Sequence, residues 1–380
     1  MRKTNGILTT VCLVIGLLIV IGGWNMIWSQ QQSQTSKALP SSTPPKLIFA
    51  ETLHGTTTIW TATADMLEDR TNIYSFQHAY GWDGQFSFSP DKTSIAFISV
   101  TEASGYDIKE TTLNVLDINR QKSKEIDNGV YLYVQPIWSP DSETILYERK
   151  TNLKNNPTVS SVSVFSIRKD GSEKKLLFQT DAFDVLLIGI GENNAILYYQ
   201  ITAQNKDIYV FEPQEQSQRL VKHFVNESAN DFQLSPDRKQ ILFTVLTNSS
   251  PSQASMYVLN LIDDSMIVSN LGDSNQFSSP IWSSAGGEIL SEMEGGKLLS
   301  HYSLRVRKTE ARIDKEANSN IPVSTKGKDK LLSVSSEGRF LVLRNHASST
   351  DYLNVIDLIQ QNRLEIPSNG WLQFVGWLLE

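Results

Sequence analysis

The side chains that most often bind metals or carry catalysis are few in this chain and widely spaced. The single cysteine is Cys12, and the five histidines are His54, His78, His223, His301 and His346. Zinc sites place histidine and cysteine ligands within a few residues of one another, a spacing that these residues do not have. The Gly-x-Ser-x-Gly elbow of the α/β-hydrolases is also missing from the sequence. We therefore expect no metal, no cofactor and no enzymatic activity.

One glycine pair has the spacing at which a phosphate-binding loop begins. Gly189-Ile190-Gly191 matches the start of a Gly-x-Gly-x-x-Gly loop, but the third glycine position holds Asn194. The same segment aligns with a turn that recurs elsewhere in the chain. We interpret it as a turn.

Aromatic side chains with polar groups gather in two segments that are candidates for partner binding. The first segment holds His78, Tyr80 and Trp82, and the second holds Tyr131 and Tyr133. Such side chains are frequent at protein interfaces, because they combine a large apolar area with hydrogen bonding. The alternative is that they pack inside the fold, and the sequence leaves both interpretations open.

Length, composition and charge narrow the class of protein. The chain has 380 residues and a formal net charge of −7, and 40% of its residues are hydrophobic. A nucleic-acid-binding protein would need a basic surface to meet phosphate groups, so the acidic balance argues against that class. The hydrophobic content is sufficient for a packed globular body.

The N-terminal region predicts a membrane attachment. Residues 1–6 include Arg2 and Lys3, and residues 7–28 form an uncharged apolar stretch. This length suits a helix that crosses a bilayer, and the preceding positive charges predict a cytoplasmic N-terminus. A cleaved signal peptide is the alternative. Residues 29–45 are rich in Gln, Ser, Thr and Pro, a composition typical of a linker.

The rest of the chain, residues 46–380, contains a repeat of about 49 residues. Its marker is a short apolar triplet, which occurs at Leu47-Ile48-Phe49, Ile95-Ala96-Phe97, Ile145-Leu146-Tyr147, Ile196-Leu197-Tyr198, Ile241-Leu242-Phe243, Ile289-Leu290-Ser291 and Leu341-Val342-Leu343. An apolar strand precedes each triplet except the first, and one or two further strand-like segments follow. Four short strands for each repeat predict an all-β fold, a β-propeller.

A turn precedes most of the triplets. It is Ser89-Pro90-Asp91, Ser139-Pro140-Asp141 and Ser235-Pro236-Asp237 in its full form, and Ser283-Ser284-Ala285-Gly286 and Ser335-Ser336-Glu337-Gly338 in weakened form. Proline presets the backbone for a type I turn, and the Ser and Asp side chains can bond nearby backbone N–H groups. Because these residues recur with the repeat, we interpret them as structural.

Seven triplets predict seven blades, with six or eight as alternatives because two repeats are degenerate. A strand is missing before the first triplet, and a surplus strand, residues 372–377, follows the last blade. Trp377 occupies the repeat position of Trp138 and Trp282. We therefore expect the C-terminal strand to complete the first blade and close the ring.

The pattern Trp-Ser-Pro-Asp followed by an apolar triplet resembles the WD40-like repeat of TolB-type β-propellers. It is also similar to the propeller domains of prolyl oligopeptidase and dipeptidyl peptidase relatives. The resemblance covers about residues 46–380 and implies the propeller fold. TolB itself has a small α/β domain before a six-bladed ring, and the peptidases carry their catalytic residues on a separate hydrolase domain, so neither function carries over directly.

These features together favour a propeller held outside the cytoplasmic membrane by its N-terminal helix. We expect it to be a non-catalytic platform for binding an envelope or extracellular protein. Variable loops between strands would supply the binding surface. A propeller enzyme of the lactonase or hydrolase kind, and a receptor for envelope glycans or peptides, are the alternatives.

Overall fold

The computed structural model describes residues 43–378, with short gaps at 105–106, 154–155, 226, 248–252, 274–279, 284–287, 293–297, 307–310, 316–320, 323–328, 348–349 and 361. The chain divides into two compact units, Met1–Thr43 and Pro44–Glu380. The predicted membrane segment, residues 7–28, and most of the predicted linker lie outside the described residues. Within the part that is described, no helix is both long and apolar enough to span a membrane.

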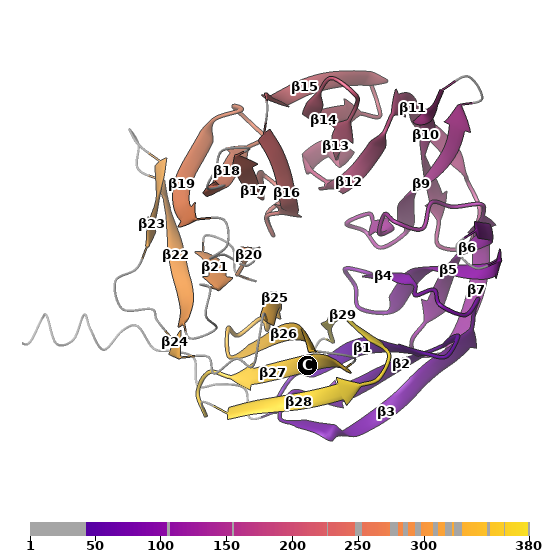
Figure 1. Cartoon of the computed structure of the whole chain (residues 1–380), viewed down its shortest axis with the longest axis vertical. Coiled ribbons are helices and arrows are strands. Elements are labelled where there is room, and N and C mark those ends of the chain that lie inside the picture. The colour runs from indigo at the N-terminus through magenta and orange to yellow at the C-terminus, as the bar shows by residue number, and fades with distance from the viewer. Residues whose placement is uncertain are drawn as a thin grey trace, which may run out of the picture. The chain divides into compact units, whose positions relative to one another are not determined.

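The second unit consists of antiparallel sheets arranged as a ring (Figure 1). Sheet 1 contains β1 (Lys46–Leu53), β2 (Thr56–Thr63), β3 (Met66–Gln77) and β29 (Trp371–Trp377). Sheet 2 contains β4 (Gln85–Phe88), β5 (Ser94–Ser104), β6 (Asp107–Asp117) and β7 (Lys122–Asn128). Sheet 3 contains β8 (Ile137–Trp138), β9 (Thr144–Leu153), β10 (Asn156–Arg168) and β11 (Lys175–Ala182).

The remaining sheets follow in chain order. Sheet 4 contains β12 (Asp184–Ile190), β13 (Ile196–Ile201), β14 (Lys206–Glu212) and β15 (Ser217–Phe224), and sheet 5 contains β16 (Glu227–Leu234), β17 (Gln240–Thr247), β18 (Gln253–Asn260) and β19 (Met266–Asp273). Sheet 6 contains β20 (Ile281–Trp282), β21 (Glu288–Glu292), β22 (Leu298–Val306), β23 (Ala311–Lys315) and β24 (Ile321–Pro322). Sheet 7 contains β25 (Asp329–Val334), β26 (Phe340–Ala347), β27 (Thr350–Asp357) and β28 (Asn362–Ser368).

The all-β propeller expected from the repeat is confirmed, but not with seven regular blades. Among the described residues, six sheets are four-stranded. Sheet 6 has five strands, because β22 pairs with both β23 and β24. The turn expected in sheet 6, residues 283–286, has neither the Pro nor the Asp of the full turns. The turn of sheet 7 also lacks both residues, yet sheet 7 keeps four strands, so the pairing of β24 with β22 is what makes sheet 6 irregular.

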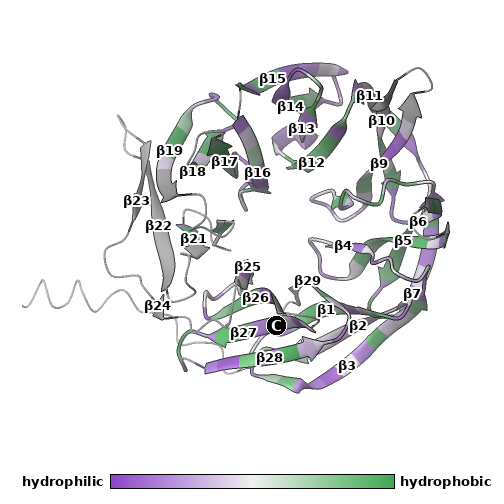
Figure 2. Cartoon of the chain, in the orientation of Figure 1, coloured by the Kyte–Doolittle hydropathy of each residue, from purple (hydrophilic) through white to green (hydrophobic). Residues whose placement is uncertain are grey.

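The core lies between neighbouring sheets rather than in one central cluster. Each apolar triplet falls in the second strand of its sheet, where side chains of both faces are buried, such as Leu47, Ile48 and Phe49 in β1. Seven hydrophobic clusters join consecutive sheets, and one of them joins sheet 7 to sheet 1 through Phe340 and Leu372. The outer strand β3 is mostly exposed and carries hydrophilic residues along much of its length (Figure 2).

The C-terminal strand pairs with the first strand, as the repeat predicts. Residues of β29 pair antiparallel with β1 from Leu47↔Trp377 to Thr52↔Trp371. The equivalence of the three tryptophans also holds in their hydrogen bonds. The indole Nε1 of Trp138 donates to the Ser87 carbonyl oxygen, and that of Trp377 donates to Ser333 Oγ; Trp282 makes the corresponding bond to Gln233. Each indole thus reaches the inner strand of the preceding sheet.

The three full turns share one hydrogen-bond pattern. In the turn of sheet 3, the Ser139 hydroxyl donates to Asp141 Oδ1 at 2.5 Å and accepts the backbone N–H of Thr144 at 2.8 Å. The backbone N–H of Glu143 donates to the same Asp141 oxygen at 3.1 Å. The Ser139 and Glu143 bonds lower the pKa of Asp141.

This pattern predicts a moderate cost for removing the serine. Ser139→Ala leaves the partly buried Thr144 N–H without its side-chain acceptor, which costs about 1–2 kcal/mol. For a unit of this size, the melting temperature should fall by roughly 2–6 °C, measured by differential scanning calorimetry. Ser336→Ala, at an exposed position of the turn in sheet 7, serves as the control. An unchanged melting temperature for Ser139→Ala would contradict the assigned role.

The segment Gly189-Ile190-Gly191 takes the place of such a turn. Gly189 and Ile190 end β12, and Gly191 leads into the 3-10 helix η1 (Glu192–Asn194), after which β13 begins. A Cβ at Gly189 would lie 3.0 Å from a terminal side-chain carbon of Leu234 in sheet 5, so a side chain here would require Leu234 to shift. The segment is a connection within sheet 4.

Alternating strand directions give the ring two different faces. The turns after the inner strands and the hairpins between third and fourth strands lie at one end of the sheets, which we call the turn face. The hairpins between second and third strands and the connections between sheets lie at the other end, which we call the loop face. The candidate aromatic residues 78–82 and 131–133 belong to connections on the loop face.

Candidate functional site

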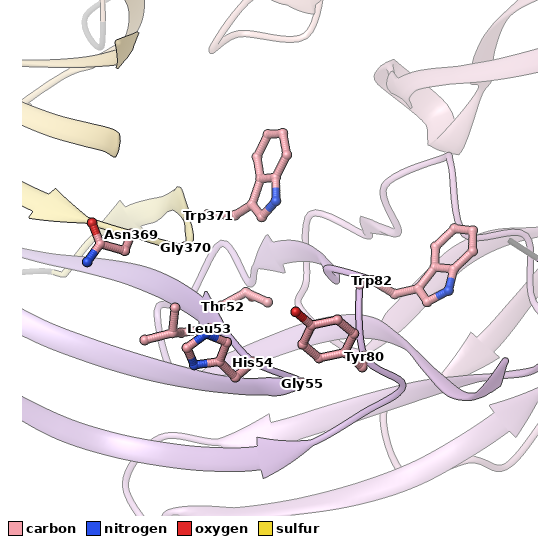
Figure 3. A pocket seen from close by; sticks show the side chains of 10 residues that line it. Thr52, Leu53, His54, Gly55, Tyr80, Trp82, Asn369, Gly370 and Trp371 are labelled. Carbon is pink, nitrogen blue, oxygen red and sulfur yellow. The ribbon is translucent and has the colours of Figure 1, made fainter. Parts of the chain in front are cut away.

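Three segments that are distant in the sequence meet at a pocket on the loop face (Figure 3). They are the β1–β2 hairpin, the connection after β3 and the connection between β28 and β29. The cavity has a volume of about 290 Å³ and is lined by Thr52, Leu53, His54, Gly55, Tyr80, Gly81, Trp82, Asn369, Gly370 and Trp371. We call it the aromatic pocket. It forms only because ring closure places β29 beside β1.

Two glycines allow the segments to approach one another. Gly55 has a φ of +77° in the β1–β2 hairpin, a conformation that residues with a side chain rarely adopt. A Cβ at Gly370 would overlap the Thr52 carbonyl oxygen, so a side chain there would push the β28–β29 connection away from the hairpin. Trp371, the next residue, is thereby held at the edge of the pocket.

Tyr80 and Trp371 present the largest exposed aromatic surface of the pocket. Their exposed fractions are 76% and 55%. The Arg344 guanidinium lies over the Trp371 ring, 5.2 Å from its centroid, and pairs with Asp351 at 2.8 Å. Asp351 is fully buried and also accepts the backbone N–H of Leu372 at 2.7 Å. The Trp371 ring is thus supported by groups that are themselves fixed.

Trp82 and His78, two of the predicted binding residues, are partly inside the fold. Trp82 lines the pocket but also packs against the cluster between sheets 2 and 3. His78 Nδ1 bonds to the Ala79 carbonyl oxygen at 3.0 Å, so its Nε2 accepts from the Thr57 hydroxyl at 3.0 Å. Burial lowers the pKa of His78, which favours this neutral form. His78 therefore ties the connection after β3 to the β1–β2 hairpin, to which its backbone N–H also donates at Gly55.

Tyr131 and Tyr133 lie on the next connection, between β7 and β8, and do not line the aromatic pocket. Their rings meet edge to face with centroids 5.5 Å apart, and Tyr133 is 61% exposed. Lys150 Nζ donates to the Tyr131 hydroxyl at 3.2 Å and pairs with Asp184 at 3.2 Å. The five predicted residues are thus divided between two places on the loop face.

The lining of the aromatic pocket sets what it can do chemically. None of its ten residues carries a carboxylate, an ammonium or a guanidinium group. Ring faces, the exposed His54 imidazole and the Asn369 amide offer apolar contact and hydrogen bonding, which suits binding. The Thr52 hydroxyl is buried and already bonded to the Thr57 hydroxyl at 2.6 Å. Across the described residues, no group of three His, Cys, Asp or Glu side chains could hold a metal ion.

Of the ten lining residues, only Tyr80 and Trp82 were predicted from the sequence. Trp371 and the hairpin residues 52–55 were not candidates, because they are more than 300 residues apart in the chain. One signal could have found them. Once the C-terminal strand is assigned to the first blade, the connection that leads into it must reach the loop face beside the first hairpin.

Comparisons with known proteins place the fold without assigning an activity. No family model matches the chain, and no curated protein matches it in sequence. Among solved structures, TolB from Acinetobacter baumannii is similar with a TM-score of 0.52 and 14% identity, over 89% of this chain and 68% of that one. A prolyl endopeptidase has a TM-score of 0.55 and 12% identity, over 87% of this chain and about half of that one, 50%.

An enzyme that is matched over nearly its whole length also shares the fold. The periplasmic gluconolactonase PpgL from Pseudomonas aeruginosa has a TM-score of 0.54 and 12% identity, over 87% of this chain and 99% of that one. The TolB-like propeller fold expected from the Trp-Ser-Pro-Asp repeat is therefore confirmed. Identities this low show the fold alone.

Proposed function

We propose that this protein is a non-catalytic platform that binds a protein partner through the aromatic pocket. The observation that supports this most is the exposure of Tyr80 and Trp371, at 76% and 55%, around one cavity. Large aromatic rings left in water cost free energy that a partner recovers when it covers them. Rings held by a rigid frame also lose little entropy on binding.

The proposed location is the extracytoplasmic side of a membrane. It is supported by the uncharged apolar stretch 7–28 and by Arg2 and Lys3 before it. Residues 29–45 would then tether the propeller at a distance from the bilayer. The partner would be an envelope or extracellular protein.

We further infer that sheet 6 serves as the seventh blade of the ring. The support is the set of hydrophobic clusters: one joins sheet 5 to sheet 6 through Met256 and Trp282, and another joins sheet 6 to sheet 7 through Ile281 and Leu331. A closed ring keeps its loop-face segments at fixed distances from one another. Such a scaffold suits a preorganised binding surface.

An enzyme that acts on a sugar lactone or a related ester is the second candidate. The similarity to a periplasmic gluconolactonase over nearly the whole of that chain favours it. A receptor for envelope glycans or peptides remains the third, since exposed aromatic rings also suit such ligands. Turnover of a panel of sugar lactones by the purified protein, or retention on a glycan array, would distinguish them from the platform.

The platform proposal predicts that binding depends on the two exposed rings. We expect Tyr80→Ala combined with Trp371→Ala to weaken capture of an envelope protein at least tenfold, since each anchor residue of an interface contributes about 1–2 kcal/mol or more. The melting temperature should change little, because both side chains are more than half exposed. Quantitative pull-down and calorimetry measure the two effects.

The control for this experiment is Ile262→Ala. Ile262 is 69% exposed and lies in the β18–β19 hairpin, on the turn face. It should leave capture unchanged. Capture that survives the double substitution would contradict the assigned surface, and a large loss of stability would assign the two rings to the core.

A further inference from the structure

A second pocket opens on the turn face, opposite the aromatic pocket. It has a volume of about 420 Å³ and is bordered by sheets 2 to 5. Its apolar lining comprises Pro90, Pro140 and Pro236 of the three full turns together with Ile137, Trp138, Ile190 and Leu234. Gly189 adds backbone without a side chain. The remaining lining residue, Arg238, is the only one that carries a charge.

Arg238 occupies a position that recurs after each full turn, and the side chains at the other two such positions interact with neighbouring residues. It follows the Ser-Pro-Asp turn of sheet 5 with a φ of +60°, and the equivalent residues are Lys92 (φ +62°) and Ser142 (φ +61°). Lys92 Nζ lies over the Phe88 ring, 4.7 Å from its centroid. Ser142 is buried and accepts the Asp91 backbone N–H at 3.0 Å.

The Arg238 guanidinium, in contrast, has no counterion. No ion pair or side-chain hydrogen bond joins it to any residue that the structure describes. Two nearby acids have other partners: Glu192 pairs with Lys239 at 3.4 Å, and Asp237 accepts the Ser235 hydroxyl at 2.6 Å. A third acid, Glu212, lines a neighbouring pocket together with Arg238, but no ion pair joins the two within the described residues. A half-buried cation beside an apolar cavity is therefore left to interact with water or a ligand.

We propose that this pocket binds a small amphipathic carboxylate. The carboxylate pairs with the Arg238 guanidinium, whose planar fork matches two carboxylate oxygens. The alkyl or aryl body lies against Ile137, Ile190 and Leu234 and leaves water. A ligand with further polar groups would leave them unpaired against this lining, so a single anionic head on an apolar body is the complementary chemistry. The volume lies within the range of small-molecule sites.

The test uses octanoate as the probe and the full chain in one detergent for all variants. Isothermal titration calorimetry should detect octanoate binding to the unmodified protein, and Arg238→Gln should weaken it at least tenfold. Arg238→Lys should retain part of the affinity, because it keeps the charge and loses the fork. Octanol, which lacks the charge, and acetate, which lacks the body, should both bind more than tenfold more weakly than octanoate.

Folding of the variants does not confound the result. The Arg238 side chain makes no bond within the described residues. Gln, like Arg, is unbranched at Cβ and should fit the same backbone conformation, so the melting temperature should stay the same. Equal octanoate affinity in Arg238→Gln, equal affinity for octanol, or no octanoate binding at millimolar concentration would each overturn the proposal.

Discussion

A chain that ends at Asn369 is expected to lose its cooperative unfolding transition and to aggregate. This truncation removes β29, whose residues pair with β1 from Leu47 to Thr52. It also removes Leu372, which is fully buried in the cluster between sheets 1 and 7, together with Trp377, whose indole bonds to Ser333. The exposed edge of β1 would then be free to pair with other chains.

The expected loss exceeds that of any single side chain. As a matched control, Leu372→Ala should keep the fold and lower the free energy of unfolding by about 2–5 kcal/mol, the range for a large-to-small change in a core. Calorimetry and size-exclusion chromatography would report both variants. If the truncated chain melted as a monomer at the temperature of the full chain, closure by β29 would not stabilise the ring.

A more stable protein is expected when Glu148 is replaced by methionine. Glu148 lies in β9 and is only 1% exposed, and neither of its carboxylate oxygens has a hydrogen-bond partner of good geometry. Burial raises the pKa of Glu148 well above its usual range, and the nearby charge of Asp184 adds to the effect. Lys150 and the Leu187 backbone amide oppose it only in part.

The sign of the pH dependence follows from this shift. The folded state holds the Glu148 proton more tightly than the unfolded state, so ionisation destabilises the fold as the pH rises above the unfolded pKa of 4.5. The destabilisation stops growing once the pH passes the folded pKa. At pH 8 we expect Glu148→Met to raise the free energy of unfolding by about 1–3 kcal/mol, the cost of a buried polar group without partners.

Glu148→Gln separates charge from polarity in this experiment. It removes the titration, so stability should no longer fall with pH through this group, but it leaves an amide without partners and should gain less than methionine. Urea unfolding at pH 4 and pH 8 measures both effects. If both variants were less stable than the unmodified protein at pH 8, the Glu148 carboxylate would have to be held by a favourable contact with Lys150 or Leu187.

The sequence predicted the blades well where local chemistry determines them. The triplets, such as Ile145-Leu146-Tyr147, have strand propensity on both faces and fall in second strands throughout. The Ser-Pro-Asp turns fix their own hydrogen bonds, and Trp377 could be placed by its repeat position. The fifth strand of sheet 6 could not be predicted, because the pairing of β24 with β22 is a tertiary contact that no local signal announces.

The site was harder to predict, because burial and proximity are tertiary properties. Trp82 and Tyr80 are two residues apart, yet one packs partly between sheets and the other is 76% exposed. Nothing local distinguishes them. Glu148 likewise directly follows a strand triplet, and only the packing of sheet 4 against sheet 3 buries it.

Site-specific photocrosslinking tests the platform proposal most directly. A photoreactive amino acid in place of Tyr80, on the loop face, should crosslink a defined envelope protein in intact cells, whereas the same group in place of Ile262, on the turn face, should not. That result would identify the partner and locate its contact at the aromatic pocket. Identical crosslinked products at both positions, or none at position 80, would contradict a partner-binding role for this surface.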